Sequence, residues 1–350
     1  MLKQLKQLIA TLLFLFLTIP LLGQYFGQNK VNYEQFDFKI YKTPHFWIYN
    51  YLDNNEAIKG IGEQSEYWYN RHFSIFRDTV TKNPIIFYNN HADFKQTTVI
   101  SALIGVGTGG VTDGLRKRIV MPFMVSNKET DHVLGHEMIH VFQYNMVLES
   151  DSLGFESLNN LPLWMVEGLA EYMSIGPNDN KTAMWLRDAV LHDDVPSIED
   201  MTRKPNEYFP YRYGHAFWSF ITGIWGDAMI KPIFHHTALM GMENAIDSLF
   251  GITADSLSNL WVKSVKRTHQ PYIHDSINPV GEKLFTPENS GELNLSPVLS
   301  PKGEKVAFLT NKNVISIDLM IANTENKKII KKLSSSIRQA HIDDFNYIES

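Results

Sequence analysis

Hydrophobic and polar positions change their spacing along the chain, and this change predicts a sheet region followed by a helical region. Residues 36–52 alternate apolar and polar side chains, as half-buried strands do, whereas residues 54–76 have the spacing of a helix. Residues 84–89 form a short apolar run that is typical of a buried strand. Residues 109–123 predict a β-hairpin with its turn at the Asp-Gly dipeptide 113–114.

The pattern becomes helical after the hairpin. Helical spacing recurs in successive segments, at 127–147, 162–174, 181–192, 212–224, 227–240 and 254–267. A stretch rich in proline and glycine follows and predicts a linker over residues 271–293. From residue 294 the chain again has the pattern of strands. The overall prediction is an α+β protein with a mixed sheet first, helices second and an all-β segment last.

The first 23 residues have the composition of a secretory signal peptide. Lys3 and Lys6 supply positive charge, and an almost unbroken apolar run extends from Leu8 to Leu22. That run is short for a membrane span, which needs about 20 apolar residues. We therefore expect residues 1–23 to be removed and the mature protein to be exported to the periplasm, the cell surface or the medium, without a stable membrane span. An uncleaved anchor is the alternative.

Composition narrows the chemistry that the chain can perform. Its 350 residues include 32 Lys and Arg, 38 Asp and Glu and no cysteine, and the formal net charge is −6. Nucleic-acid binders concentrate Lys and Arg, so we expect no nucleic-acid partner. Without cysteine there is no disulfide, no thiol nucleophile and no cysteine-ligated metal. Any metal ion must therefore be held by histidine and carboxylate side chains.

The candidate chemistry lies in the sequence His-Glu-Met-Ile-His at 136–140. On a helix His136 and His140 share one face, about 40° apart around the axis, so both imidazoles can bind one ion. Glu137 is offset by about 100° from His136 and can flank the ion without binding it, which suits a general base that takes a proton from water. Ser126 and Glu129 have the spacing of a capping box and begin this helix. Two structural histidines are the alternative.

A third ligand is predicted from the next helix. It begins after Pro162 and carries Glu167 and Glu171 four residues apart on one otherwise apolar face. Like charges at this spacing destabilise each other, and near a buried face they need a cation or hydrogen-bond donors. Catalytic zinc takes three protein ligands, so we assign Glu167 as the third. Glu171 would accept a hydrogen bond from a ligand histidine. A solvated acidic face is the alternative.

Together the two motifs, HExxH and W-x-x-E-G-x-A-E-Y at 164–172, resemble the gluzincin metallopeptidases, the thermolysin-like group that includes the M1-type aminopeptidases. The resemblance covers residues 35–268 and implies a zinc metallopeptidase domain over residues 24–270, with Zn²⁺ as its cofactor. The resemblance implies the same three metal ligands, His136, His140 and Glu167, as the spacing of the residues does. It also implies the same general base, Glu137. It also implies an edge strand against which an extended peptide pairs, and we place that strand at residues 117–123.

The resemblance also bears on residues outside the two motifs. Members usually add a tyrosine or histidine that stabilises the oxyanion, for which Tyr213 is our first choice and His215 our second; an aromatic helix start packed on the core is the alternative. His132, one turn before His136, could line the site. The segment Gly-Met-Glu-Asn at 241–244 is only a shortened likeness of the amine-binding signature of aminopeptidases, so that activity is not implied.

The tail resembles one repeat of a TolB-like β-propeller. A Ser-Pro-Lys-Gly turn at 300–303 is followed by apolar strands at 306–310 and 315–322. A single blade cannot bury both faces, so we expect residues 294–350 to be a partial propeller that begins a longer array. A second blade would start within 341–350. A small β-appendage is the alternative.

These features predict an exported zinc metallopeptidase that acts on peptides or proteins. Two alternatives remain open. One is a catalytically silent peptidase-like protein of the cell envelope, which would act as a scaffold and bind an envelope partner through its propeller. The other is a zinc hydrolase that cleaves a non-peptide amide, since the metal chemistry would be the same.

Overall fold

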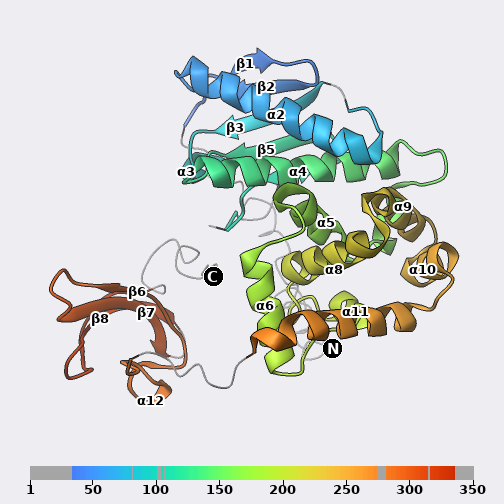
Figure 1. Ribbon diagram of the computed structural model, residues 1–350. Helices are drawn as coiled ribbons and strands as arrows, with labels where there is room; N and C mark the ends of the chain where they lie inside the picture. The colour runs from blue at the N-terminus through green and yellow to red at the C-terminus, as the bar shows by residue number, and fades with distance from the viewer. Residues whose placement is uncertain are drawn as a thin grey trace, which may run out of the picture.

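The structure is a computed structural model that describes residues 34–80, 82–100, 104–105, 107–273, 281–313 and 316–335. Within these residues a five-stranded mixed sheet is followed by a helical lobe and then by a four-stranded antiparallel sheet (Figure 1). This arrangement confirms the predicted α+β class. The predicted signal peptide at 1–23 and the predicted start of a second blade at 341–350 lie outside the described residues.

The first sheet has the strand order β1-β2-β3-β5-β4. Its strands are β1 (Lys39–Lys42), β2 (Phe46–Asn50), β3 (Asn83–Tyr88), β4 (Val111–Asp113) and β5 (Arg118–Pro122). β2, β3 and β5 run parallel, while β1 and β4 pair antiparallel at the two edges. The prediction that residues 117–123 form the edge strand is therefore wrong. β5 pairs with β3 on one side and β4 on the other, so among the described residues β4 is the outermost strand at this edge of the sheet.

Two long helices, α2 (Asn55–Phe76) and α4 (Asn127–Leu148), pack on one face of this sheet (Figure 1). Alternate strand residues point toward them, because successive side chains of a strand lie on opposite faces. The predicted capping box of α4 is confirmed: Ser126 Oγ accepts from the Glu129 amide at 3.2 Å, and Glu129 Oε2 accepts from the Ser126 amide at 3.2 Å. A Cβ on Gly135 would lie 2.7 Å from the Trp68 ring, so α2 can approach α4 this closely only at a glycine.

The helical lobe follows the sheet. Its helices are α5 (Leu163–Ile175), α6 (Asn180–Leu191), α7 (Ile198–Arg203), α8 (Pro210–Trp225), α9 (Ile230–Met240), α10 (Met242–Phe250) and α11 (Ala254–His269). Shorter pieces are α3 (His91–Phe94), η2 (Phe155–Asn160), η3 (Asp227–Met229) and η4 (Gln270–Tyr272). α5 and α8 approach most closely at two glycines, since a Cβ on Gly214 would lie 2.0 Å from the Trp164 carbonyl oxygen and one on Gly168 2.2 Å from the Gly214 backbone. This contact brings the first turn of α8 beside Glu167.

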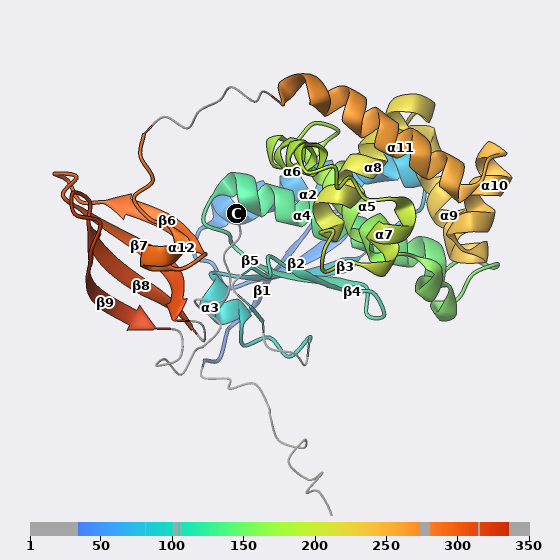
Figure 2. The same ribbon diagram turned by 90° about the horizontal axis from the view of Figure 1, so that it is seen from below.

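The second sheet is an open antiparallel sheet set to one side of the first sheet and the helical lobe (Figure 2). It contains β6 (Asn294–Leu299), β7 (Lys305–Asn313), β8 (Ser316–Asn323) and β9 (Ile329–Ser335), in sequence order. One face buries Phe308 and Met320, and Phe285 stacks on Phe308 with ring centroids 4.1 Å apart. Phe285 and the short helix α12 (Pro287–Ser290) fall in the predicted linker 271–293, yet they pack against this sheet.

Candidate metal centre

The two predicted motifs meet where α4 and α5 pack together. His136, Glu137 and His140 lie on α4, while Glu167 and Glu171 lie on α5. The side chain of Gln143, on α4, donates to the Val166 carbonyl oxygen at 2.9 Å and so ties the two helices together beside the histidines. Four of the five motif residues are buried, and Glu167 is half-buried.

Three potential ligand atoms converge at this crossing. Oε2 of Glu167 lies 3.3 Å from Nε2 of His136 and 3.4 Å from Nε2 of His140. Ligand atoms about 2.1 Å from a tetrahedral zinc ion lie about 3.4 Å from one another, whereas an N–H···O hydrogen bond is usually about 2.9–3.0 Å long. The spacing therefore matches that of ligand atoms around a zinc ion and is long for a direct hydrogen bond. These three residues could hold a metal ion.

Hydrogen bonds at Nδ1 orient the imidazole rings of His136 and His140. Nδ1 of His136 donates to Oε1 of Glu171 at 3.0 Å, and Nδ1 of His140 donates to Oε1 of Gln143 at 2.8 Å. A proton held on Nδ1 leaves the lone pair of Nε2 for a metal. The role of Gln143 was missed by sequence reasoning. The signal was its position three residues after His140, which places it on the neighbouring part of the same helix face.

A second group of possible ligands shares His136. Oε1 of Glu171 lies 3.1 Å from Nε2 of His132 and 3.0 Å from Nδ1 of His136, so these three residues also lie close enough to hold an ion. Both distances are those of ordinary hydrogen bonds. In addition, Nη1 of Arg212 contacts the other oxygen of Glu171 at 3.1 Å. The charge of this carboxylate is therefore already compensated by a guanidinium group.

The histidines and carboxylates of the site shift one another's pKa. Burial would lower the pKa of His136, but its hydrogen bonds to Glu167 and Glu171 outweigh burial and raise the pKa. Burial would raise the pKa of Glu167, but the charges and hydrogen bonds of His140 and His136 hold it well below its usual range. Glu171 is likewise held low, against burial, by His132 and His136. Glu167 and Glu171 therefore both stay ionised at neutral pH.

The structure brings a tyrosine other than the predicted one to the cluster. The ring of Tyr211 stacks on His136, with centroids 5.7 Å apart and planes 9° from parallel. Burial and the adjacent Glu167 carboxylate raise the pKa of Tyr211, so its phenol stays protonated and can donate a hydrogen bond. Tyr213, our first choice, instead packs against Trp185 and Tyr208 on another side of α8.

His215, the second choice, also points elsewhere. Its Nε2 donates to the Gly176 carbonyl oxygen at 2.8 Å, and the residue lines a cavity of about 540 Å³ between α6, α8 and α11. His132 does lie in the cluster, through its contact with Glu171. The 241–244 segment lies at the junction of α9 and α10.

The side chain of Glu137 forms a hydrogen bond with a residue of the first sheet. Oγ1 of Thr112, on the edge strand β4, lies 2.7 Å from Oε2 of Glu137. Glu137 is also close enough to His136 and His140 to raise their pKa. The predicted general base thus flanks the cluster on the side of β4, as its helical offset requires. Sequence reasoning did not identify Thr112.

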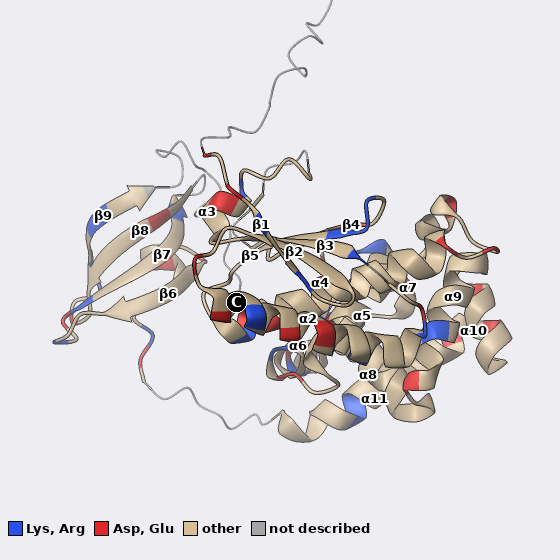
Figure 3. Ribbon diagram, turned by 90° about the horizontal axis from the view of Figure 1, so that it is seen from above, with Lys and Arg blue, Asp and Glu red and all other residues tan. Residues whose placement is uncertain are grey.

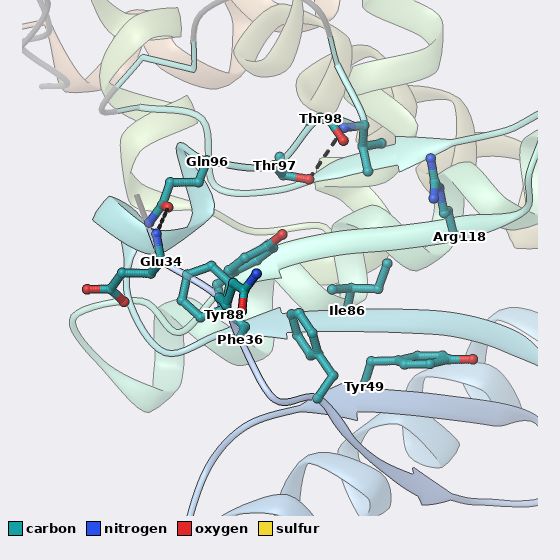
Figure 4. A pocket seen from close by; sticks show the side chains of 12 residues that line it. Glu34, Phe36, Tyr49, Ile86, Tyr88, Gln96, Thr97, Thr98 and Arg118 are labelled. Carbon is teal, nitrogen blue, oxygen red and sulfur yellow. Dashed lines mark hydrogen bonds between the residues drawn. The ribbon is translucent and has the colours of Figure 1, made fainter. Parts of the chain in front are cut away.

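Another cavity lies apart from this cluster. It has a volume of about 530 Å³ and opens on the face of the first sheet that α2 and α4 leave uncovered. Figure 4 shows its aromatic and aliphatic floor, formed by Phe36, Tyr49, Ile86 and Tyr88, with Arg118 at one end. The guanidinium of Arg118 forms an ion pair with the Asp113 carboxylate, with Nη2 and Oδ2 3.1 Å apart. The residues that could bind a metal do not line this cavity.

No protein-family model matches the chain, and no curated protein matches it significantly. Among the described helices, none has the length and apolar character that crossing a membrane would require.

Proposed function

We propose that this protein is a zinc-dependent peptidase. The observation that carries the proposal is the convergence of His136 Nε2, His140 Nε2 and Glu167 Oε2 at 3.3 and 3.4 Å, with Glu137 beside them. Two imidazoles and one carboxylate are a common ligand set of catalytic zinc, which keeps its remaining position for water or substrate. The absence of cysteine from the chain agrees with this ligand set.

Each residue near the cluster has a distinct task in this proposal. Glu137 takes a proton from the attacking water and passes it to the nitrogen of the departing amine. Tyr211 donates a hydrogen bond from its phenol to the oxygen of the attacked carbonyl, where negative charge develops. Glu171 and Gln143 hold the two histidines in the required tautomers. Zinc, when bound, lowers the pKa of water and polarises the carbonyl.

The substrate class is suggested by the free edge of the first sheet. β4 is the outermost strand, and the same strand contacts Glu137 through Thr112. An extended peptide can add to such an edge by backbone hydrogen bonds, which would carry its scissile carbonyl past the base. We therefore propose peptides or proteins in extended conformation as substrates. The pairing strand is β4, in place of the segment 117–123 expected from the sequence.

Export and the role of the second sheet are part of the same proposal. The apolar run between Leu8 and Leu22 supports a signal peptide and hence a protein that works outside the cytoplasm. The open sheet β6–β9 has the strand succession expected of one propeller blade. We propose that it belongs to a propeller that could bind an envelope partner.

The test pairs metal analysis with digestion of a peptide library by the wild type and by Glu137→Gln. We expect about one zinc per chain in both proteins, and cleavage by the wild type only, because the substitution removes the base and spares the ligands. Glu129→Gln, on the exposed first turn of the same helix, is the matched control and should cleave normally. Full activity in Glu137→Gln would contradict the proposal. Zinc binding without cleavage of any peptide would favour the alternative of a catalytically silent scaffold protein.

A further inference from the structure

We propose that Thr112 is a positioning residue that fixes the carboxylate of Glu137 from the edge strand β4. This inference rests on the proposed peptidase function, because it concerns how the general base is held. Oγ1 of Thr112 lies 2.7 Å from Oε2 of Glu137 and 2.9 Å from the backbone oxygen of the same residue. The hydroxyl has one proton to donate. Hydrogen bonds from a hydroxyl to a carboxylate are about 2.5–2.7 Å long and the stronger of the two kinds, so the carboxylate is the preferred acceptor.

The carboxylate is also confined at Gly110, on the same segment as Thr112. A Cβ on Gly110 would lie 2.8 Å from Cγ and 3.0 Å from Oε1 of Glu137. Gly110 and Thr112 are two residues apart, so they lie on the same face of an extended segment. Thr112 thus holds Oε2, and the missing side chain at Gly110 leaves room for Oε1. Oε1 is then the oxygen left to accept the proton of the attacking water.

The segment that carries Thr112 is itself anchored. Thr112 pairs with Ile119 of β5, a fully buried residue, and the next pair joins Asp113 to Arg118. The guanidinium of Arg118 also contacts the Asp113 carboxylate at 3.1 Å. Figure 3 shows Lys and Arg positions, in blue, at the hairpin that joins β4 to β5. The hydroxyl of Thr112 therefore has a fixed position relative to the sheet.

This placement links the base to the substrate. The inner side of β4 pairs with β5, and its outer side is the free edge proposed to bind the peptide. One short strand would then set the position of both the scissile carbonyl and the carboxylate that acts on it. Misplacing a reacting group by about 1 Å can cost a hundredfold in rate. Loss of the Thr112 contact should therefore slow the chemical step without weakening substrate binding.

The test compares Thr112→Val, which removes the hydroxyl and keeps the β-branched shape, with Thr112→Ser, which keeps the hydroxyl. Both are assayed as the zinc-loaded full chain on a peptide that the wild type cleaves. We expect Thr112→Val to lower kcat by about tenfold to a hundredfold and Thr112→Ser by about twofold at most. KM and zinc content should not change. Gly110→Ala, whose Cβ would displace Cγ and Oε1 of Glu137, should lower kcat in the same way.

A kcat of Thr112→Val equal to that of the wild type would overturn the inference, as would a Thr112→Ser as slow as Thr112→Val. A second comparison places Thr112→Val in the Glu137→Gln background. No further loss is expected there, because residues that act as a unit are not additive. An additive loss would show that Thr112 acts by another route. Failure of the proposed function is distinguishable, because Glu137→Gln would then be as active as the wild type, or the wild type itself would cleave no peptide.

Discussion

Two groups of histidine and carboxylate share His136, and they differ in what surrounds the carboxylate. In the first group, Oε2 of Glu167 lies 3.3 Å from Nε2 of His136 and 3.4 Å from Nε2 of His140. In the second, Oε1 of Glu171 lies 3.0 and 3.1 Å from His136 and His132. Arg212 contacts the second oxygen of Glu171.

The difference shows that closeness of ligand types does not by itself identify a metal site. Glu171 already accepts hydrogen bonds from two histidines and is paired with a guanidinium, so a cation there would displace protons and face a positive charge. His136 also cannot serve both groups. If it binds a metal through Nε2, its proton stays on Nδ1 and is donated to Glu171. We therefore expect one metal per chain, in the first group.

The largest effect is expected from His140→Ala. His140 belongs only to the first group, and its loss leaves two protein ligands where catalytic zinc takes three. The variant should lose stoichiometric zinc binding and peptidase activity together, as measured by elemental analysis and peptide digestion. Zinc retained at one equivalent in this variant would show that the ion sits in the second group.

A smaller effect is expected from Glu171→Gln. The substitution removes the charge that orients His136 and balances Arg212 but leaves all three proposed ligands in place. Changes in the partner of a ligand histidine typically lower metal affinity by about 10- to 100-fold. Zinc affinity measured by competition with a chromophoric chelator should fall within that range. Complete loss of zinc would instead make Glu171 a direct ligand.

The pH dependence of zinc affinity gives a third test. The pKa of His136 is raised by its carboxylate partners, so the metal-free site holds a proton there that zinc must displace. Below the raised pKa, affinity should fall by about tenfold per pH unit for each proton displaced, and it should rise as pH increases. For the same reason, the metal-free fold loses the stabilisation of this proton as pH rises through that pKa. An affinity that is constant with pH would contradict this picture.

The smallest effect is expected from His132→Ala, the counterpart of His140→Ala. His132 is partly exposed and only donates to Glu171, which keeps His136 and Arg212 as partners. Its loss should lower zinc affinity by less than about tenfold, below the range typical of direct supports of a ligand. The chelator competition assay measures this as well. A loss as large as that of His140→Ala would remove the distinction between the two groups.

The elements and the candidate ligand residues could be predicted because both depend on local spacing. Helical periodicity places His136 and His140 on one face whatever surrounds them, and α4 and α5 match the predicted ranges to within a residue or so. The same periodicity separates Glu137 from the ligands. α7 and α10 are not among the predicted helices; the six residues of α7 carry too few turns for a clear period.

Features that depend on contacts between distant segments could not be predicted. The tyrosine beside the site is Tyr211, because α8 begins at Pro210 rather than at residue 212 and its first turn lies on α5 at Gly168. Tyr213 is two positions on, about 200° around the helix, and so faces away. The hairpin pattern likewise does not reveal which of its strands pairs with β3. Only the sheet order shows that β4 is the edge and that Thr112 meets Glu137.

The most direct test of the account is a calorimetric titration of zinc into metal-free protein, carried out on the wild type and on Glu167→Ala. We expect saturation at one zinc per wild-type chain and no stoichiometric binding to Glu167→Ala, because the ion is proposed to bind at His136, His140 and Glu167, which lie close enough together to hold one. Two zinc ions per wild-type chain, no binding at all, or one zinc retained by Glu167→Ala would contradict it.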